Sequence, residues 1–189
     1  MIVGPMYNLV LLPDVNYYFK NDFLKDWSPV QIEAQERILF LVLRDNKPRE
    51  ELQPEDFYPI GVSARIDSIE EDGSIHVHTL ERVDISEIEI HDGYIEAEAC
   101  VRAEVDDLPK EEESERFTRI QRALLQFVQK YQWGMWARSY ILQWNNTEEA
   151  VCTLTEYLNL TPDEKYQILA ADSERERFNC MEQAIYELV

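Results

Sequence analysis

Hydrophobic and polar positions alternate along three successive segments between residues 55 and 105. A period of two places the apolar side chains on one face of a β-strand. Asp72-Gly73 and Asp92-Gly93 separate the three runs, and Asp-Gly is a strong hairpin signal because a tight turn needs positive φ. The pattern predicts an antiparallel meander with one apolar face. Its alternating apolar positions are Ile60, Val62, Ala64 and Ile66; Ile75 and Val77 in a run from Ser74 to Ile85; and Ile95, Ala97, Ala99 and Val101.

Shorter elements precede the meander. Residues 6–12 and 15–19 are predicted strands, and the second is rich in aromatic residues. Ser28-Pro29 is predicted to open a short helix, with serine as N-cap and proline at the first helical position. The continuous apolar run from Ile38 to Leu43 is typical of a strand buried on both faces, and residues 44–53 form a charged loop.

The hydrophobic period lengthens to that of a helix after Glu113. We predict a first helix whose apolar face carries Phe117, Ile120, Leu124, Phe127, Val128 and Tyr131. A short helix around residues 136–144, one over 148–158, one from the Thr161–Glu164 capping box to Ala170, and a last one from Ser173 follow. The fold class is α+β: a β-rich domain over 1–108, an acidic connector, and a helical bundle over 113–189.

The charge balance restricts the partners. The 38 acidic residues outnumber 18 basic ones, for a net charge of −20. Such a surface repels phosphate backbones and anionic membranes, so we expect protein partners, no nucleic acid and no membrane. Three widely spaced cysteines and the lack of a basic N-terminal segment before apolar residues favour a reducing, cytoplasmic location without a signal peptide.

Motifs for catalysis are missing from the sequence. It contains no P-loop, no G-x-G-x-x-G and no G-x-S-x-G, so we expect no catalytic residue, no cofactor and no enzyme activity in this chain. His76, His78 and His91 could contribute to a metal site or simply face solvent, and the second reading is preferred, so no metal is expected. Cys100 could be a nucleophile only beside a base, and we expect a buried or half-exposed structural thiol.

Two aromatic groups remain. Tyr17, Tyr18, Phe19, Phe23 and Trp27 lie near the start, and consecutive rings in a strand cannot all face one core, so at least one of the first three should point outward. These five are our candidate substrate- or partner-binding residues, because exposed apolar patches mark contact surfaces. The second group is Tyr131, Trp133, Trp136, Tyr140 and Trp144, which we expect to pack between bundle and sheet.

Several segments of the chain together carry a family resemblance. They are Leu9–Val15, Ile38–Arg44, Pro54–Ile66 with its I-G-V-x-A-R-I motif, Thr79–Ile85, and Leu160–Leu169 with its T-P-D-E-K helix start, followed by Arg175–Phe178. With the order of elements, they resemble the N-terminal domain of Lon, the ATP-dependent protease also called La, over essentially the whole chain. Two segments differ: Phe19–Asp22 stands where the family usually has a Pro-Gly-like pair, and Thr79 stands at a common glycine.

The resemblance implies a β-rich, PUA-like pseudo-barrel followed by a helical subdomain. It implies recognition of unfolded or damaged proteins and support of hexamer assembly. In such proteases an ATPase domain, which uses ATP and Mg, and a Ser-Lys peptidase follow this domain; neither is present here. Extended clients could add to a sheet edge, and we predict that Tyr17→Ala or Phe19→Ala lowers client binding without unfolding.

Other interpretations stay open. The last helix runs to Val189 without a C-cap glycine, which favours a piece of a longer protease. The alternative is a standalone adaptor that binds a folded protein. A small enzyme with an unrecognised site is a third, for which the sequence offers no nucleophile–base pair.

Overall fold

The computed structural model describes residues 1–20 and 32–189. The described chain divides into two compact units, Met1–Ala103 and Glu104–Val189, and each is described by itself. The predicted division into a β-rich domain over 1–108 and a helical domain over 113–189 stays a prediction. The helix expected at Ser28-Pro29 opens outside the described residues.

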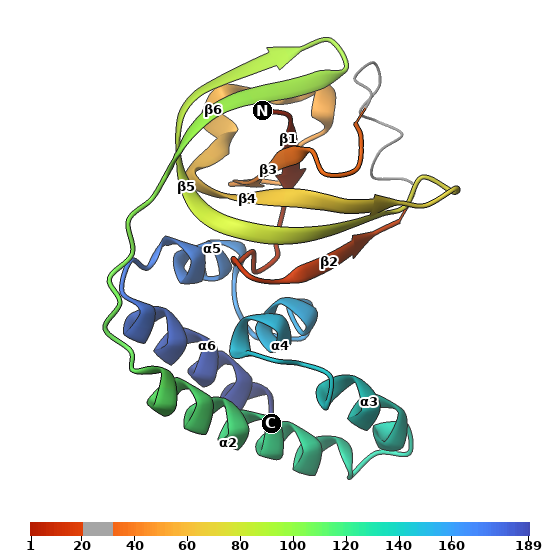
Figure 1. The fold of residues 1–189 in the computed structure, drawn as a ribbon, viewed down its shortest axis with the longest axis vertical. Coiled ribbons are helices and arrows are strands. Elements are labelled where there is room, and N and C mark those ends of the chain that lie inside the picture. Colours follow the sequence, from red (N-terminus) through yellow and green to blue (C-terminus); the bar gives the residue numbers. More distant parts are fainter. Residues whose placement is uncertain (21–31) are drawn as a thin grey trace. The chain divides into compact units, whose positions relative to one another are not determined.

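The first unit is a six-stranded sheet (Figure 1). The strand order is β1-β3-β4-β5-β2, and β6 pairs with the second half of β5. Only β1 and β3 run parallel. The strands are β1 (Val3–Met6), β2 (Asn16–Phe19), β3 (Arg37–Leu43), β4 (Phe57–Ile69), β5 (Ile75–His91) and β6 (Tyr94–Val101), and two 3-10 turns lie at Arg49–Glu51 and Pro54–Asp56.

The sheet closes through the start of the chain. The amino group of Met1 donates to the carbonyl of Ala97 at 2.8 Å, and the Ala97 N–H donates to the Met1 carbonyl at 2.9 Å. Ile2 forms an antiparallel bridge with Glu96. Because β1 also pairs with β3, these contacts join β6 to the opposite end of the sheet and produce the predicted pseudo-barrel.

The predicted meander is confirmed. β4, β5 and β6 pair antiparallel, and Gly73 and Gly93 occupy the turns with φ of 85° and 97°, values that glycine adopts without strain. β5 runs to His91, six residues beyond the predicted Ile85, because the chain reverses only at the second Asp-Gly turn. Its length lets β2 and β6 pair with different halves of the same strand.

β3 is buried on both faces, as its continuous apolar sequence predicted. Every residue from Ile38 to Leu43 is buried. One face belongs to a core made by Val3, Leu39, Leu41, Leu43, Leu52, Phe57, Val83, Ile95 and Ala97.

The predicted strand over residues 6–12 is wrong. β1 ends at Met6, and Asn8 takes a left-handed φ of 54°, which interrupts an extended strand. Val10, Leu11 and Leu12 are nevertheless fully buried, so their hydrophobicity reflects packing without strand pairing.

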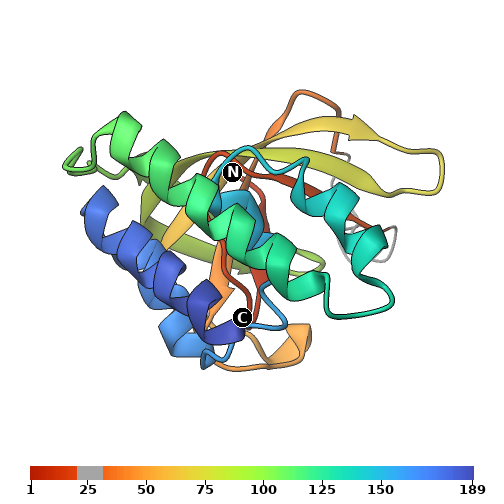
Figure 2. The same ribbon diagram turned by 90° about the horizontal axis from the view of Figure 1, so that it is seen from below.

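The second unit is helical. Figure 2 shows α2 and α6 side by side, and Ile120, Leu124 and Val128 of α2 are buried in the same unit as Phe178 and Ile185 of α6. The helices are α2 (Lys110–Val128), α3 (Gly134–Ile141), α4 (Thr147–Thr153), α5 (Pro162–Ala170) and α6 (Glu174–Leu188).

Helix bounds differ from the prediction in α2, α3 and α4. α3 runs from Gly134 to Ile141 and ends before Trp144, which was expected in the same helix. α2 begins at Lys110, inside the acidic segment, because Glu111, Glu112 and Glu113 suit the positive end of the helix dipole. α4 ends at Thr153, five residues before the predicted Leu158. The Thr161–Glu164 capping box is present as predicted.

Candidate functional site

The predicted aromatic site begins on β2, at the end of the strand order. Successive side chains of a strand point to opposite faces, so Tyr18 points away from Tyr17 and Phe19. Tyr18 exposes 52% of its surface, whereas its two neighbours are half-buried. The expectation that at least one of these three rings faces outward is therefore met by Tyr18. Phe23 and Trp27 lie outside the described residues.

Tyr17 and Phe19 belong partly to the interior. Their rings stack with centroids 5.9 Å apart, and the Phe19 ring lies 5.3 Å from that of Phe40, a fully buried residue of β3. The Tyr17 hydroxyl donates to the Val10 carbonyl at 3.2 Å. Replacing Phe19 by alanine is therefore expected to lower stability as well as any binding, and Tyr18 is the better position for a test.

The outer surface around Tyr18 combines an aromatic ring with polar groups. The ring lies 4.8 Å from that of His76, whose Nε2 is 3.4 Å from Glu70 Oε1. His78, two residues on, lies 3.3 Å from Asp14. His76 is exposed, as the preferred interpretation of the sequence expected, whereas His78 is half-buried and its Nδ1 lies 2.9 Å from Asn16 Oδ1. The surface can pack an apolar side chain on the ring and offer hydrogen bonds at its margin.

The second aromatic group is exposed, and the expectation that its tryptophans are packed is wrong for two of them. Trp133 and Trp136 expose 54% and 73% of their surface, and Tyr131 and Tyr140 are also exposed. Trp144 alone of the group is half-buried. The candidate site proposed from the sequence therefore left out the more exposed set of rings. The lack of any aspartate or glutamate in residues 116–147 was the signal in the sequence that could have pointed to this surface.

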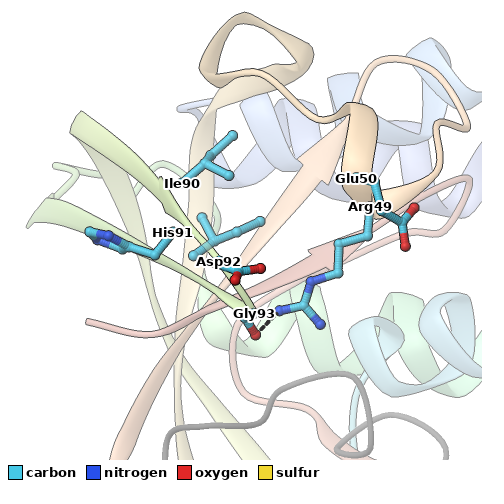
Figure 3. Close-up of a pocket in the computed structure, with 7 residues that line it drawn as sticks. Arg49, Glu50, Ile90, His91, Asp92 and Gly93 are labelled. Atoms are coloured by element: carbon cyan, nitrogen blue, oxygen red, sulfur yellow. Dashed lines mark hydrogen bonds between the residues drawn. The ribbon is translucent and has the colours of Figure 1, made fainter.

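A pocket of about 730 Å³ lies at the turn between β5 and β6 (Figure 3). Arg49 reaches across it and donates through Nη2 to the carbonyl of Gly93. Glu50, His91 and Asp92 also line it, so its polar side chains are one guanidinium engaged with the backbone, two carboxylates and one imidazole. Of the sequence-predicted binding residues that the structure describes, Tyr17, Tyr18 and Phe19, none lines this pocket.

One group of side chains near this turn has the composition of a metal site. Ligand atoms of Glu89, His91 and Glu96 lie within 4.8 Å of one another. His91 Nε2 is shielded from solvent and lies 3.3 Å from Glu89 and 3.6 Å from Glu96, without hydrogen-bond geometry. A divalent cation could bind here, but one imidazole between two exposed carboxylates is equally an ordinary surface ion pair.

The cysteines are free thiols in the structure. Cys100 is exposed on β6, opposite Asp84 on β5, so of the expected buried or half-exposed thiol the buried alternative is wrong. Cys152 is buried in α4.

Comparison with known proteins identifies the family. The family model of the ATP-dependent protease La (LON) substrate-binding domain matches residues 24–185. The chain belongs to this family. It is 25% identical over 182 residues to the Lon protease of Clostridium beijerinckii, covering 93% of this chain and 22% of that protein. The chain thus spans about a fifth of the length of that relative.

Two solved structures share the fold of this Lon-family domain. The N terminal domain of Mycobacterium avium complex Lon protease matches with a TM-score of 0.59 at 15% identity, over 100% of this chain and 98% of that one. The Lon N-terminal domain protein from Xanthomonas campestris matches with a TM-score of 0.51 at 16% identity, over 95% and 94% of the two chains. The α+β class and the family resemblance are therefore confirmed. Among the described helices, none has the length and apolar character needed to cross a bilayer.

Proposed function

We propose that this chain is the non-catalytic, substrate-recognising part of a cytoplasmic Lon-type ATP-dependent protease. It binds unfolded or damaged polypeptide and contributes to hexamer assembly, while ATP and Mg are used by an ATPase domain that this chain does not contain. The observation that carries the proposal is the family match over residues 24–185. The exposed rings support it, since an apolar surface kept in water is typical of a contact site.

Tyr18 offers a direct test of the site predicted from the sequence. The isolated chain is titrated with fluorescently labelled casein, an unfolded protein, and binding is followed by anisotropy. Replacing Tyr18 by alanine is expected to weaken binding about three- to tenfold, the loss of one aromatic contact. Stability should not change, because the side chain is half exposed. The control is Tyr157→Ala, which removes another exposed tyrosine in the helical unit.

Deletion of the domain from its parent protease tests the proposal as a whole. Loss of casein degradation with retained ATP hydrolysis is the expected result. Unimpaired degradation, together with no casein binding by the isolated chain, would reject substrate recognition. Binding to a folded protein but not to casein would instead favour the adaptor interpretation.

A further inference from the structure

The acidic residues of this chain are unevenly distributed. Residues 116–147 contain no aspartate and no glutamate, although the whole chain has 38 of them. The same stretch carries five basic residues: Arg116, Arg119, Arg122, Lys130 and Arg138. A positively charged segment therefore lies within a protein of net charge −20, and it spans most of α2, all of α3 and the turn between them.

Four of the five cations face solvent. Arg116 is the exception, because it is buried and forms an ion pair with Glu182. Its guanidinium carbon also lies 4.4 Å from the centroid of the Phe178 ring. Arg119, Arg122, Lys130 and Arg138 are exposed, and within residues 1–20 and 32–189 the structure records no ion pair for them. Their charges are thus available to a ligand at this surface.

The exposed rings lie in the same stretch. Tyr131 and Trp133 stack with centroids 5.0 Å apart, and Trp136 lies 5.1 Å from Tyr140. Met135, between the two pairs, exposes 86% of its surface. We give the name aromatic face to the exposed residues of this turn and of α3, which extend around more than one side of that helix: Lys130, Tyr131, Trp133, Met135, Trp136, Arg138 and Tyr140.

Local contacts hold the aromatic face in place. Gly134 donates to the Tyr131 carbonyl at 3.0 Å and lies so close to the end of α2 that a Cβ would overlap the Val128 carbonyl. The Gln121 side chain donates to the carbonyl of Ile141 at 2.9 Å and connects the end of α3 to α2. Because these backbone positions are fixed, the rings are presented with less entropy to lose on binding.

We propose that the aromatic face binds extended polypeptide segments in which carboxylates flank apolar or aromatic side chains. The inference rests on the proposed function and names the client chemistry and the site. The rings supply stacking and apolar area, and Lys130 and Arg138 supply the complementary charge. Elsewhere the acidic surface repels such a client, so the carboxylate-free stretch is the place where charge favours it.

Three labelled peptides of equal length test the charge preference. They share the same leucine and phenylalanine positions and differ only in spacers of aspartate, serine or lysine. Anisotropy titrations at low salt are expected to give the tightest binding for the aspartate peptide, at least tenfold tighter than for the lysine peptide. Equal affinity for all three, or a preference for lysine, would overturn the proposal.

Two sets of variants assign the preference to the aromatic face. The double variant with Lys130→Glu and Arg138→Glu should lose the preference for the aspartate peptide. The double variant with Trp133→Ala and Trp136→Ala should bind all three peptides about tenfold more weakly or worse. The controls are Arg37→Glu, an exposed arginine of the other unit, and Tyr157→Ala. Retained preference in the charge variants, with circular dichroism unchanged, would overturn the assignment.

Failure of this inference can be told apart from failure of the proposed function. Casein binding that survives in both sets of variants leaves substrate recognition standing and places it elsewhere. If the wild-type chain also fails to bind casein, both this inference and the proposed function are wrong. If the wild type self-associates and the variants do not, the ligand of the aromatic face is a second copy of this chain. If the wild type binds a single-stranded oligonucleotide tightly, the ligand is nucleic acid. Either result would overturn the polypeptide client.

Discussion

Thr79 shows how one side chain can fasten two distant parts of the barrel. Its hydroxyl donates to the Val15 carbonyl at 3.0 Å and accepts from the Val15 N–H at 2.8 Å. The residue is fully buried. This chain therefore uses a hydroxyl to hold the start of β2 against β5.

Replacing Thr79 by valine is expected to lower the free energy of unfolding by about 1–3 kcal/mol. The volume is kept, but a buried backbone N–H loses its acceptor. Urea unfolding monitored by circular dichroism measures the change. The control is Thr118→Val, because the Thr118 hydroxyl donates to the Ser114 carbonyl on an exposed helix surface. Equal stability of the two variants would contradict this role of Thr79.

The limits of sequence reasoning are visible at single residues. The alternation of side chains along a strand correctly predicted that Tyr17, Tyr18 and Phe19 divide between two faces. The pairing of β2 with β5 decides which of these faces is interior. The hydrogen bonds between Met1 and Ala97 join residues 96 apart in sequence, and local patterns carry no trace of them. The left-handed φ of Asn8 is likewise not visible in the sequence, so the apolar residues alone predicted a strand over 6–12 that the structure does not have.

At the scale of elements, Asp107 links the start of the helical unit to α6. Its carboxylate accepts from the Ser173 hydroxyl at 2.6 Å and from the Arg175 N–H at 2.9 Å. These hydrogen bonds hold the pKa of Asp107 below its ordinary value. The Arg175 guanidinium in turn donates to both oxygens of Glu112 on α2 and lowers the pKa of that carboxyl too.

A pH dependence of stability follows from the lowered pKa of Asp107. A carboxyl whose pKa is lower in the folded state stabilises the fold above its unfolded pKa, about 3.9 for aspartate. The contribution is lost as pH falls through the folded pKa. Asp107→Asn should therefore be less stable than wild type at pH 7, and the difference should shrink toward pH 3.

Urea unfolding at the two pH values measures this difference. Glu71→Gln, which removes an exposed carboxylate next to the β4–β5 turn, is the matched control and should leave stability unchanged at both. A difference between wild type and Asp107→Asn that stays constant from pH 7 to pH 3 would contradict the assignment.

Elements with strong local signals could be predicted, and the binding surface could not. The Asp-Gly turns, the buried β3 and the Thr161 capping box depend on neighbouring residues, so their positions were found from sequence. The exposure of Trp133 and Trp136 depends on how α3 folds back on α2, which periodicity does not give. The carboxylate-free stretch was a usable signal for this surface.

At the scale of the whole molecule, each unit has a core of its own. The barrel core gathers residues from Val3 to Ala97, and the helical unit buries Ile120, Leu169 and Phe178. We therefore predict that residues 1–103 and 104–189, produced separately, each fold.

Cooperative urea unfolding and dispersed amide resonances for both fragments are the expected result. The urea unfolding transition of each fragment should also match the unfolding transition of the same unit in the intact chain. A fragment without a cooperative transition would show that the two compact units are a single folding domain.

The carboxylate-free stretch of α2 and α3 also gives this protein an electric dipole that its composition hides. At neutral pH a chain of net charge −20 is expected to flow through a negatively charged resin. Four exposed cations on α2, on α3 and in the turn between them give it a region that can adhere. Modest salt would release it, because exposed charges are screened over about 10 Å at 0.1 M. Molecules captured in this way would all adhere to the resin through the same part of the helical unit.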